Sequence, residues 1–512
     1  MKYIRKNTIE YREYQVRLAE QAFKENCIVV LPTGLGKTAI AAQVIAAYME
    51  GDRPAAVLFL APTRVLAGQH HDFLQSVLTI DDIALVTGED AARRRSNLWN
   101  ASVICATPEI TRNDLTRGMI TPDMFGLVVF DEVHRAVGDY AYSGIAQRME
   151  ESRPLILGMT ATLPSDRDKA TEIIARLRTT SVAERSEASP DVSPYIQKTE
   201  TEVVIVDLTP KLLEIQSLLR RALNARCRML RQNRIDTPDN PSLSSLLQLR
   251  SHVLEHNRGS ATPLFTAIRI HYALSMLEAQ GIEPFLKFCK RARAKRGAGI
   301  RELFEADPNF TRALALAEEA RRDGIEHPKL AKMVELLAEI RGKILVFASY
   351  RDSVDMICSV LDRLGMPSGK LIGKAGQAGL KQRQQIETVR RFRDGEFSIM
   401  VATRVGEEGL DIAEVNHVIF YDNVPSSIRY VQRRGRTGRK TAGRLIVLTA
   451  KGTVDEAYYW TGRRKIRTAR SMGRVMSNEL GADKSNEADA DGTGSKQGTG
   501  QSVAKTGLDA FI

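Results

Sequence analysis

Two short motifs about a hundred residues apart carry residue types that bind phosphate and a divalent cation. They are Leu31-Pro-Thr-Gly-Leu-Gly-Lys-Thr38 and Val128-Val-Phe-Asp-Glu-Val-His134. The first follows an apolar run at 27–30 and precedes apolar residues at helical spacing, which is the strand–turn–helix context of a phosphate-binding loop. Glycines let backbone N–H groups converge on phosphate oxygens, and the helix N-terminus adds its positive dipole end.

Each motif supplies two reactive side chains. In the loop, Lys37 is predicted to reach the β and γ phosphates and the Thr38 hydroxyl to hold Mg²⁺. In the acidic motif, Asp131 is placed to hold the metal and Glu132 to polarise the attacking water. Leu31 breaks the strict glycine pattern, so the loop alone could be a tight turn without a ligand. Both motifs together, in this order, predict an enzyme that hydrolyses a nucleoside triphosphate.

Length and composition indicate an ordinary globular protein of two to four domains. The chain has 512 residues, of which 43% are hydrophobic and 27% charged. No apolar run reaches membrane-spanning length, and the N-terminus lacks the apolar core of a signal peptide. Five widely spaced cysteines suggest neither a disulfide framework nor a zinc site. We therefore expect buried, reduced thiols in a cytoplasmic protein with no membrane partner.

The charge balance favours a polyanionic partner. The net charge is +12 and the isoelectric point about 9.4. Residues 211–300 alone hold sixteen basic and six acidic side chains. A solvated helical face explains any single arginine better, whereas the whole segment favours a nucleic-acid surface.

Apolar runs divide the chain into two α/β regions separated by a helical one. Continuous apolar strands indicate parallel sheets covered by helices on both faces. The predicted fold class is α/β, with two parallel-sheet lobes and an all-helical insert in the second. The first lobe is expected to span 1–190, the second 191–210 and 336–472, the insert 211–335, and a flexible tail 473–512. The expected strands lie at 27–30, 57–61, 83–86, 103–106, 127–130, 155–158, 199–207, 343–349, 399–402, 418–421 and 445–448.

The second lobe adds an arginine-rich motif, Gln432-Arg-Arg-Gly-Arg-Thr-Gly-Arg439. Arginines at this density, separated by glycines, suit a guanidinium clamp on phosphate. Upstream lies a glycine-rich turn, Val401-Ala-Thr-Arg-Val-Gly-Glu-Glu-Gly-Leu-Asp-Ile412. With the phosphate loop on one lobe and the arginines on the other, ATP is expected in the cleft between them.

This order of motifs resembles superfamily 2 helicases over roughly residues 8–470. The motif Asp131-Glu-Val-His134, the insert and the turn at 401–412 are similar to archaeal Hef-type fork helicases. Those helicases are kin to the Fanconi-anaemia M helicases and to the RNA-sensing and Dicer helicases. The resemblance implies two RecA-like domains.

The resemblance also implies roles for individual residues. Gln15 would read adenine, Gln432 would sense the γ-phosphate, and Arg436 and Arg439 would be arginine fingers. Thr160-Ala161-Thr162 would couple hydrolysis to strand movement. Nucleotide contacts would come from Gln15, Thr33, Gly34, Gly36, Lys37, Thr38, Gly409 and Asp411. Sugar-phosphate contacts, which do not read sequence, would come from Pro62, Thr63, Arg64, Thr87, Gly88, Thr107, Pro108 and Thr403.

The end of the chain, Lys505-Thr-Gly-Leu-Asp-Ala-Phe-Ile512, resembles a sliding-clamp (PCNA) binding peptide. Leu508, Phe511 and Ile512 have the spacing of its hydrophobic plug. Lys505 replaces the usual glutamine and Ile512 the second aromatic residue, so a chance apolar end is an equal alternative.

The resemblance leads to an ATP- and Mg²⁺-dependent 3′-to-5′ DNA helicase acting on forked, branched or single-stranded DNA in fork repair or recombination. A double-stranded-RNA-dependent ATPase or RNA helicase using the same engine is the alternative. A third is a remodelling protein that hydrolyses ATP without unwinding. The Glu-Arg-Lys-x-x-x-Asp nuclease signature of full-length Hef-type proteins is missing from the 512 residues, so no nuclease activity is expected.

Overall fold

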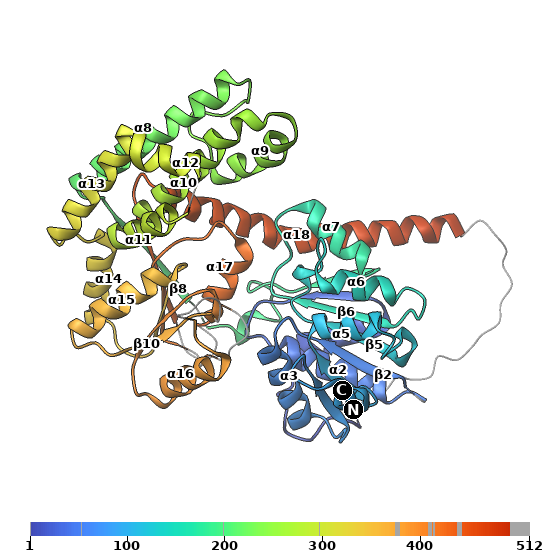
Figure 1. Cartoon of the computed structure of the whole chain (residues 1–512). Helices are drawn as coiled ribbons and strands as arrows, with labels where there is room; N and C mark the ends of the chain where they lie inside the picture. Colours follow the sequence, from blue (N-terminus) through green and yellow to red (C-terminus); the bar gives the residue numbers. More distant parts are fainter. Residues whose placement is uncertain are drawn as a thin grey trace.

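Two parallel β-sheets and a separate helical body make up the protein (Figure 1). The computed structural model describes residues 2–52, 54–197, 199–295, 297–373, 379–407, 412, 415–437 and 443–491, with side chains up to residue 480. Within that part, the predicted α/β class with two sheet lobes and a helical insert is confirmed.

The first lobe contains a seven-stranded sheet, counted over the described residues, in the order β3-β4-β2-β5-β6-β1-β7, with every pairing parallel. Its strands are β1 (Cys27–Val30), β2 (Ala56–Leu60), β3 (Ile83–Val86), β4 (Val103–Ala106), β5 (Phe125–Phe130), β6 (Leu155–Thr160) and β7 (Ser181–Glu184). Its helices are α1 (Glu13–Lys24), α2 (Lys37–Met49), α3 (Arg64–Val77), α4 (Ala92–Leu98), α5 (Pro108–Thr116), α6 (Ala141–Arg148) and α7 (Arg167–Arg176). The inner strands are buried along their length, because helices cover both faces of the sheet.

The second lobe repeats this plan with six described strands in the order β10-β11-β9-β12-β13-β8, again all parallel. Its strands are β8 (Thr199–Val206), β9 (Ile344–Phe347), β10 (Ser368–Leu371), β11 (Ile399–Ala402), β12 (His417–Phe420) and β13 (Gly443–Ala450). Its helices are α14 (Pro328–Glu339), α15 (Arg351–Arg363), α16 (Gln382–Asp394) and α17 (Ser427–Arg434).

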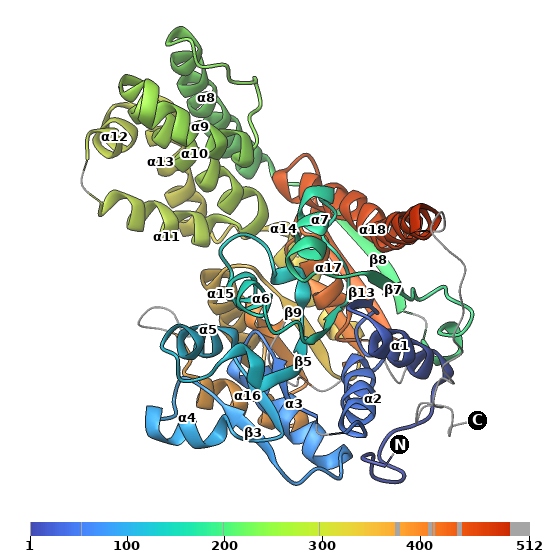
Figure 2. The ribbon, with the colours of Figure 1, turned by 90° about the vertical axis from the view of Figure 1, so that its right-hand side faces the viewer.

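The helical insert leaves the second lobe after β8 and returns before α14, and its helices form a body of their own beside that lobe (Figure 2). Its elements are α8 (Pro210–Gln232), α9 (Leu243–His256), α10 (Ala261–Gln280), α11 (Ile282–Arg293), α12 (Ala298–Arg301), a π-helical turn (Glu302–Ala306) and α13 (Pro308–Arg322). The predicted limit at 335 needs correction, because Leu330, Met333 and Leu336 of α14 pack in the core of the second lobe.

The last described helix, α18 (Val454–Asp491), begins in the second lobe and passes along the first (Figure 1). A flexible tail was expected from residue 473, but Met472 and Met476 are buried in the core of the first lobe. Those contacts fix this part of the helix, so the expected start of the tail is wrong.

None of the helices in the described part of the chain combines the length and apolar character that a membrane span requires. The five cysteines are free thiols, and four of them are buried.

Candidate active site

The phosphate loop, residues 31–38, connects the end of β1 to the start of α2. Gly34 and Gly36 have φ angles of +85° and +82°, which L side chains rarely adopt. A Cβ atom on Gly36 would also overlap the side-chain amide of Gln15. The Lys37 ammonium donates to the Leu31 carbonyl at 3.1 Å, so the lysine side chain folds back over the loop.

Gln15 and Tyr14 bring α1 against the same loop. The Gln15 amide and the Tyr14 hydroxyl both donate to the Leu35 carbonyl, at 3.0 and 2.8 Å. The amide oxygen of Gln15 is buried and accepts no hydrogen bond among the described residues. An acceptor held in this way suits the exocyclic amino group of adenine, so Gln15 fits the role that the resemblance implies.

Glu132 lies directly after β5 in a strained backbone conformation. Its φ and ψ are both 49°, a left-handed conformation that costs a residue other than glycine about 1–3 kcal/mol. One carboxylate oxygen is 3.2 Å from His134 Nδ1 but makes no hydrogen bond of good geometry among the described residues. A carboxylate on a strained backbone, with one buried and unsatisfied oxygen, is suited to accept a proton from water.

His134 and Thr160 link the acidic motif to the Thr-Ala-Thr turn. His134 Nδ1 lies 3.0 Å from the Thr160 hydroxyl, which in turn donates to the Thr162 carbonyl at 2.9 Å. The Leu31 amide of the phosphate loop donates to the Thr160 carbonyl at 3.0 Å. The turn at 160–162 therefore contacts both halves of the first lobe's site.

His70, on α3, was not predicted and lies between Thr38 and Asp131. Its Nε2 is 2.8 Å from an Asp131 carboxylate oxygen, and its Nδ1 is 3.5 Å from the Thr38 hydroxyl. The ring packs on Phe59, with centroids 4.6 Å apart. The Nε2–H group donates to Asp131 and Nδ1 lies beside the Thr38 hydroxyl, so the ring connects the two residues predicted to hold the metal.

The carboxyl of Asp131 is kept ionised. Its burial would raise its pKa, but the charge and hydrogen bond of His70 and the charge of Lys37 together lower the pKa below the ordinary value. The Asp131 carboxylate and the Thr38 hydroxyl are oxygen donors of the kind that Mg²⁺ prefers. The residues present therefore fit a magnesium ion.

The arginine motif of the second lobe reaches the phosphate loop. A Cβ atom on Gly435 would overlap the side chain of Thr33, so only glycine allows this approach. Gln432, on α17, is buried, and Arg436 donates to the Glu407 carbonyl at 2.5 Å. A cavity of about 470 Å³ lies between the loop, α17 and α18. Gly409, Asp411 and Arg439 lie outside the described residues.

The expected sugar-phosphate contacts of the first lobe follow three adjacent strands. Pro62, Thr63 and Arg64 follow β2, while the turns at 87–88 and 107–108 follow β3 and β4. These strands are neighbours in the sheet, so the turns share one edge of the lobe.

Several of the threonines also hold their own turns. The Thr63 hydroxyl caps α3 by accepting from the Leu66 amide at 3.2 Å, and the Thr87 hydroxyl donates to Asp90 at 3.1 Å. Thr107 and Thr403 are buried. Local structure thus explains these hydroxyls at least in part, and the sequence signal for nucleic acid at any one of them is weak.

Comparison with known families and proteins agrees with this geometry. Residues 12–170 match the DEAD/DEAH box helicase family, and residues 328–441 match the helicase conserved C-terminal domain. The helicase domain of Hef from Pyrococcus furiosus has 37% sequence identity and a TM-score of 0.68, with 90% of this chain and all of that chain covered.

The curated relatives are longer proteins, and this chain matches only a part of each. A Methanocaldococcus jannaschii protein named as an ATP-dependent RNA helicase is 36% identical, over 93% of this chain and 62% of its own. The ATP-dependent DNA helicase mph1 of Neurospora crassa is 32% identical, over 87% and 41%. The Fanconi anemia group M protein of Gallus gallus is 30% identical, over 91% and 26%. The chain thus spans less than two thirds of the length of these relatives.

Proposed function

Since the chain belongs to the superfamily 2 helicases of the Hef and Fanconi-anaemia M type, we propose that it is an ATP-dependent DNA helicase or translocase that moves 3′ to 5′ on forked or branched DNA. One observation carries the ATP-driven part of the proposal: Gly435 of the arginine motif touches Thr33 of the phosphate loop. A composite site of this kind closes only when both lobes meet, which couples hydrolysis to their relative movement.

In this proposal each side chain has a defined task. Lys37 binds the β and γ phosphates, and Thr38 and Asp131 hold Mg²⁺, which when bound neutralises phosphate charge. Glu132 accepts the proton of the attacking water, and Arg436 brings positive charge to the γ-phosphate from the other lobe. Gln15 selects adenine through its unsatisfied amide oxygen.

The insert supplies a surface for the duplex part of the substrate. Its basic side chains include Arg221, Arg228 and Arg258, which are exposed. Arg226 is the opposite case, since it is buried in ion pairs with Glu302 and Asp307 at 3.2 and 3.0 Å. The exposed arginines can contact phosphates from solvent, while Arg226 serves the packing of the insert.

A double-stranded-RNA-dependent ATPase is the second candidate, because the Methanocaldococcus jannaschii relative is named as an RNA helicase. Phosphate contacts do not distinguish deoxyribose from ribose. The DNA helicase and the RNA-dependent ATPase can be distinguished by measuring ATP hydrolysis in parallel with single-stranded DNA, forked DNA and double-stranded RNA. We expect the largest stimulation with forked DNA, and stimulation by RNA alone would refute the DNA proposal. Strand displacement from forks with one labelled arm then tests the 3′-to-5′ direction.

His70 provides a test of the magnesium site. Removing a group that orients metal ligands typically weakens metal affinity by about 10–100-fold. In a His70→Ala variant we expect the Mg²⁺ concentration that half-saturates binding of a fluorescent ATP analogue to rise by about ten-fold. The control is His71→Ala, since the neighbouring ring pairs with Asp72 and not with the metal ligands. An unchanged Mg²⁺ titration for His70→Ala would show that His70 does not contribute to magnesium binding.

We also propose that these 512 residues do not cut DNA, because they contain no Glu-Arg-Lys-x-x-x-Asp signature. Incubation of labelled forks with the purified chain and Mg²⁺ or Mn²⁺ tests this. Cleavage products that persist in a Glu132→Gln variant would contradict the proposal.

The last eight residues are proposed to bind a sliding clamp, and they lie outside the described residues. Their proposed plug is Leu508, Phe511 and Ile512. Deleting residues 505–512 is expected to weaken binding to immobilised clamp by at least ten-fold and to leave DNA-stimulated ATP hydrolysis unchanged. Equal clamp affinity with and without these residues would show that the apolar end is accidental.

A further inference from the structure

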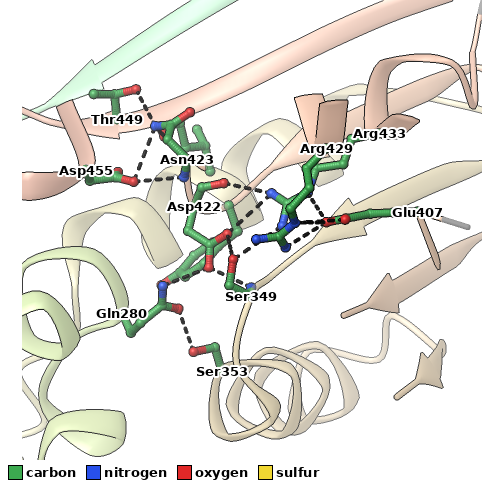
Figure 3. Close-up of polar contacts among 12 residues, drawn as sticks. Gln280, Ser349, Ser353, Glu407, Asp422, Asn423, Arg429, Arg433, Thr449 and Asp455 are labelled. Atoms are coloured by element: carbon green, nitrogen blue, oxygen red, sulfur yellow. Dashed lines mark hydrogen bonds and ion pairs between the residues drawn. The ribbon is translucent and has the colours of Figure 1, made fainter. Parts of the chain in front are cut away.

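A buried polar cluster joins the helical insert to the arginine motif (Figure 3). We call it the insert–arginine cluster; its members are Gln280, Ser349, Ser353, Glu407, Asp422 and Arg433. They come from α10, the end of β9, α15, the glycine-rich turn, the end of β12 and α17. As whole residues, Gln280, Glu407, Asp422 and Arg433 are at most 2% exposed.

Arg433 is the centre of the cluster. Its Nε donates to a Glu407 carboxylate oxygen at 2.7 Å, and its Nη1 donates to the Asp422 carbonyl at 3.0 Å. Arg429 adds hydrogen bonds to both Glu407 oxygens, at 2.8 and 2.9 Å. Because buried charges are tolerated only when paired and hydrogen-bonded, α17 is fixed to the glycine-rich turn through Glu407.

The same glutamate leads to Arg436. The backbone carbonyl of Glu407 accepts from the Arg436 guanidinium at 2.5 Å, while its side chain holds Arg433. Any shift of Glu407 or Arg433 therefore moves the residue proposed to stabilise charge on the γ-phosphate.

Gln280 is the insert's member of the cluster. It is the last residue of α10, the buried central helix of the insert. Its amide nitrogen donates to Asp422 Oδ2 at 2.8 Å, and its amide oxygen accepts from the Ser353 hydroxyl at 2.5 Å. Asp422 also accepts from the Ser349 amide and hydroxyl, at 2.6 and 2.8 Å. Contacts thus run without a gap from Gln280 through Asp422, Arg433 and Glu407 to Arg436.

We propose that Gln280 is a positioning residue through which the helical insert sets the arginine motif, so that nucleic acid on the insert changes the geometry of the ATP site. This inference rests on the proposed function, since it assumes that the insert binds nucleic acid. Packing the insert on the second lobe requires only apolar contact. Hydrogen bonds depend on direction, so the bond from the Gln280 amide to Asp422 forms in only one arrangement of the insert and the second lobe.

The test uses the reciprocity of coupled binding. If nucleic acid and ATP share this connection, a non-hydrolysable ATP analogue changes the affinity for forked DNA by some factor, and forked DNA changes the affinity for the analogue by the same factor. Gln280→Met keeps the side-chain volume and removes both hydrogen bonds. We expect this variant to reduce the coupling factor at least five-fold, with each separate affinity within two-fold of the unmodified chain.

The matched control is Gln216→Met. Gln216 is also a buried glutamine of the insert, but its amide donates to Glu278 at 2.7 Å and does not touch the cluster. The control is expected to keep the full coupling factor. A Gln280→Met variant with unchanged coupling would overturn the proposal. Equal loss in both variants, with equally lowered melting temperatures, would also overturn it, because the effect would then be general destabilisation of the insert.

The same assay gives a different result if the proposed function itself is wrong. The unmodified chain would then bind neither DNA nor RNA, or would show no coupling with ATP for either. The assay therefore uses whichever nucleic acid most stimulates ATP hydrolysis by the unmodified chain, so that the choice between DNA and RNA does not affect the result for Gln280.

Discussion

A Glu132→Gln variant is expected to hydrolyse ATP about 10²–10⁴-fold more slowly at saturating nucleic acid, because an amide cannot accept the proton of the attacking water. Binding of ATP is expected to stay within a few-fold, since Glu132 is not among the groups proposed to hold phosphate or Mg²⁺. The left-handed backbone and the unsatisfied carboxylate oxygen carry this prediction. The measurement is the steady-state rate, with a fluorescent ATP analogue for affinity.

The control for Glu132→Gln is Asp139→Asn. The Asp139 side chain is fully exposed and lies on the same segment after β5, so the substitution makes the same change of charge without touching the site. Asp139→Asn is expected to keep the normal rate. Hydrolysis at full rate by Glu132→Gln would refute the assignment of the general base.

Among the strands that the sequence predicted, those in the middle of the sheets have apolar residues on both faces. β11 was expected at 399–402 and is found there, because its four residues are all buried between helices. The missed strands, β7 and β10, lie at sheet edges and pair on one side only. β10 contains Gly369 and Lys370, which broke the apolar run on which strand prediction depends.

Chemistry that depends on order along the chain was predictable, and chemistry that depends on neighbouring strands was not. The phosphate loop and the acidic pair can each be recognised from a short stretch of consecutive residues. His70 lies 61 residues from Asp131 and meets it because β2, which precedes α3, is paired with β5 in the sheet. A histidine on an amphipathic helix offers no signal of that pairing.

The burial of α18 and the position of Gln280 were hidden for the same reason. Met472 and Met476 are one helical turn apart in an arginine-rich stretch, and only the approach of the first lobe makes that face apolar. In the sequence Gln280 is an ordinary glutamine at the end of a helix. Its contact with Asp422, 142 residues away, becomes visible only in the folded structure.

Arg436→Ala is expected to lower kcat for nucleic-acid-stimulated ATP hydrolysis by about 10³–10⁵-fold, which is the usual contribution of an arginine finger. In the structure Arg436 is held on the Glu407 carbonyl, next to the contact between Gly435 and Thr33. We propose that from this junction of the lobes its guanidinium reaches the γ-phosphate, where charge develops. The affinity for ATP is expected to change by less than ten-fold, because Lys37 and the phosphate loop remain.

The matched control for this change is Arg434→Ala. Arg434 is two residues away, but its guanidinium pairs with Glu187 of the first lobe at 3.0 Å. Loss of that partly exposed ion pair is expected to lower the rate no more than a few-fold. Rates that fall equally in both variants would show that closure of the lobes, and not transition-state charge, is what Arg436 supplies.

The double variant Glu132→Gln with Arg436→Ala tests whether the two residues act together in one site or contribute independently to the rate of ATP hydrolysis. If the base on one lobe and the arginine on the other act on the same transition state, removing both costs little more than removing the more damaging one, as in other catalytic units. Full additivity of the two losses would mean that each lobe contributes without the other. Because Gly435 meets Thr33 only when the lobes are together, we expect strong non-additivity.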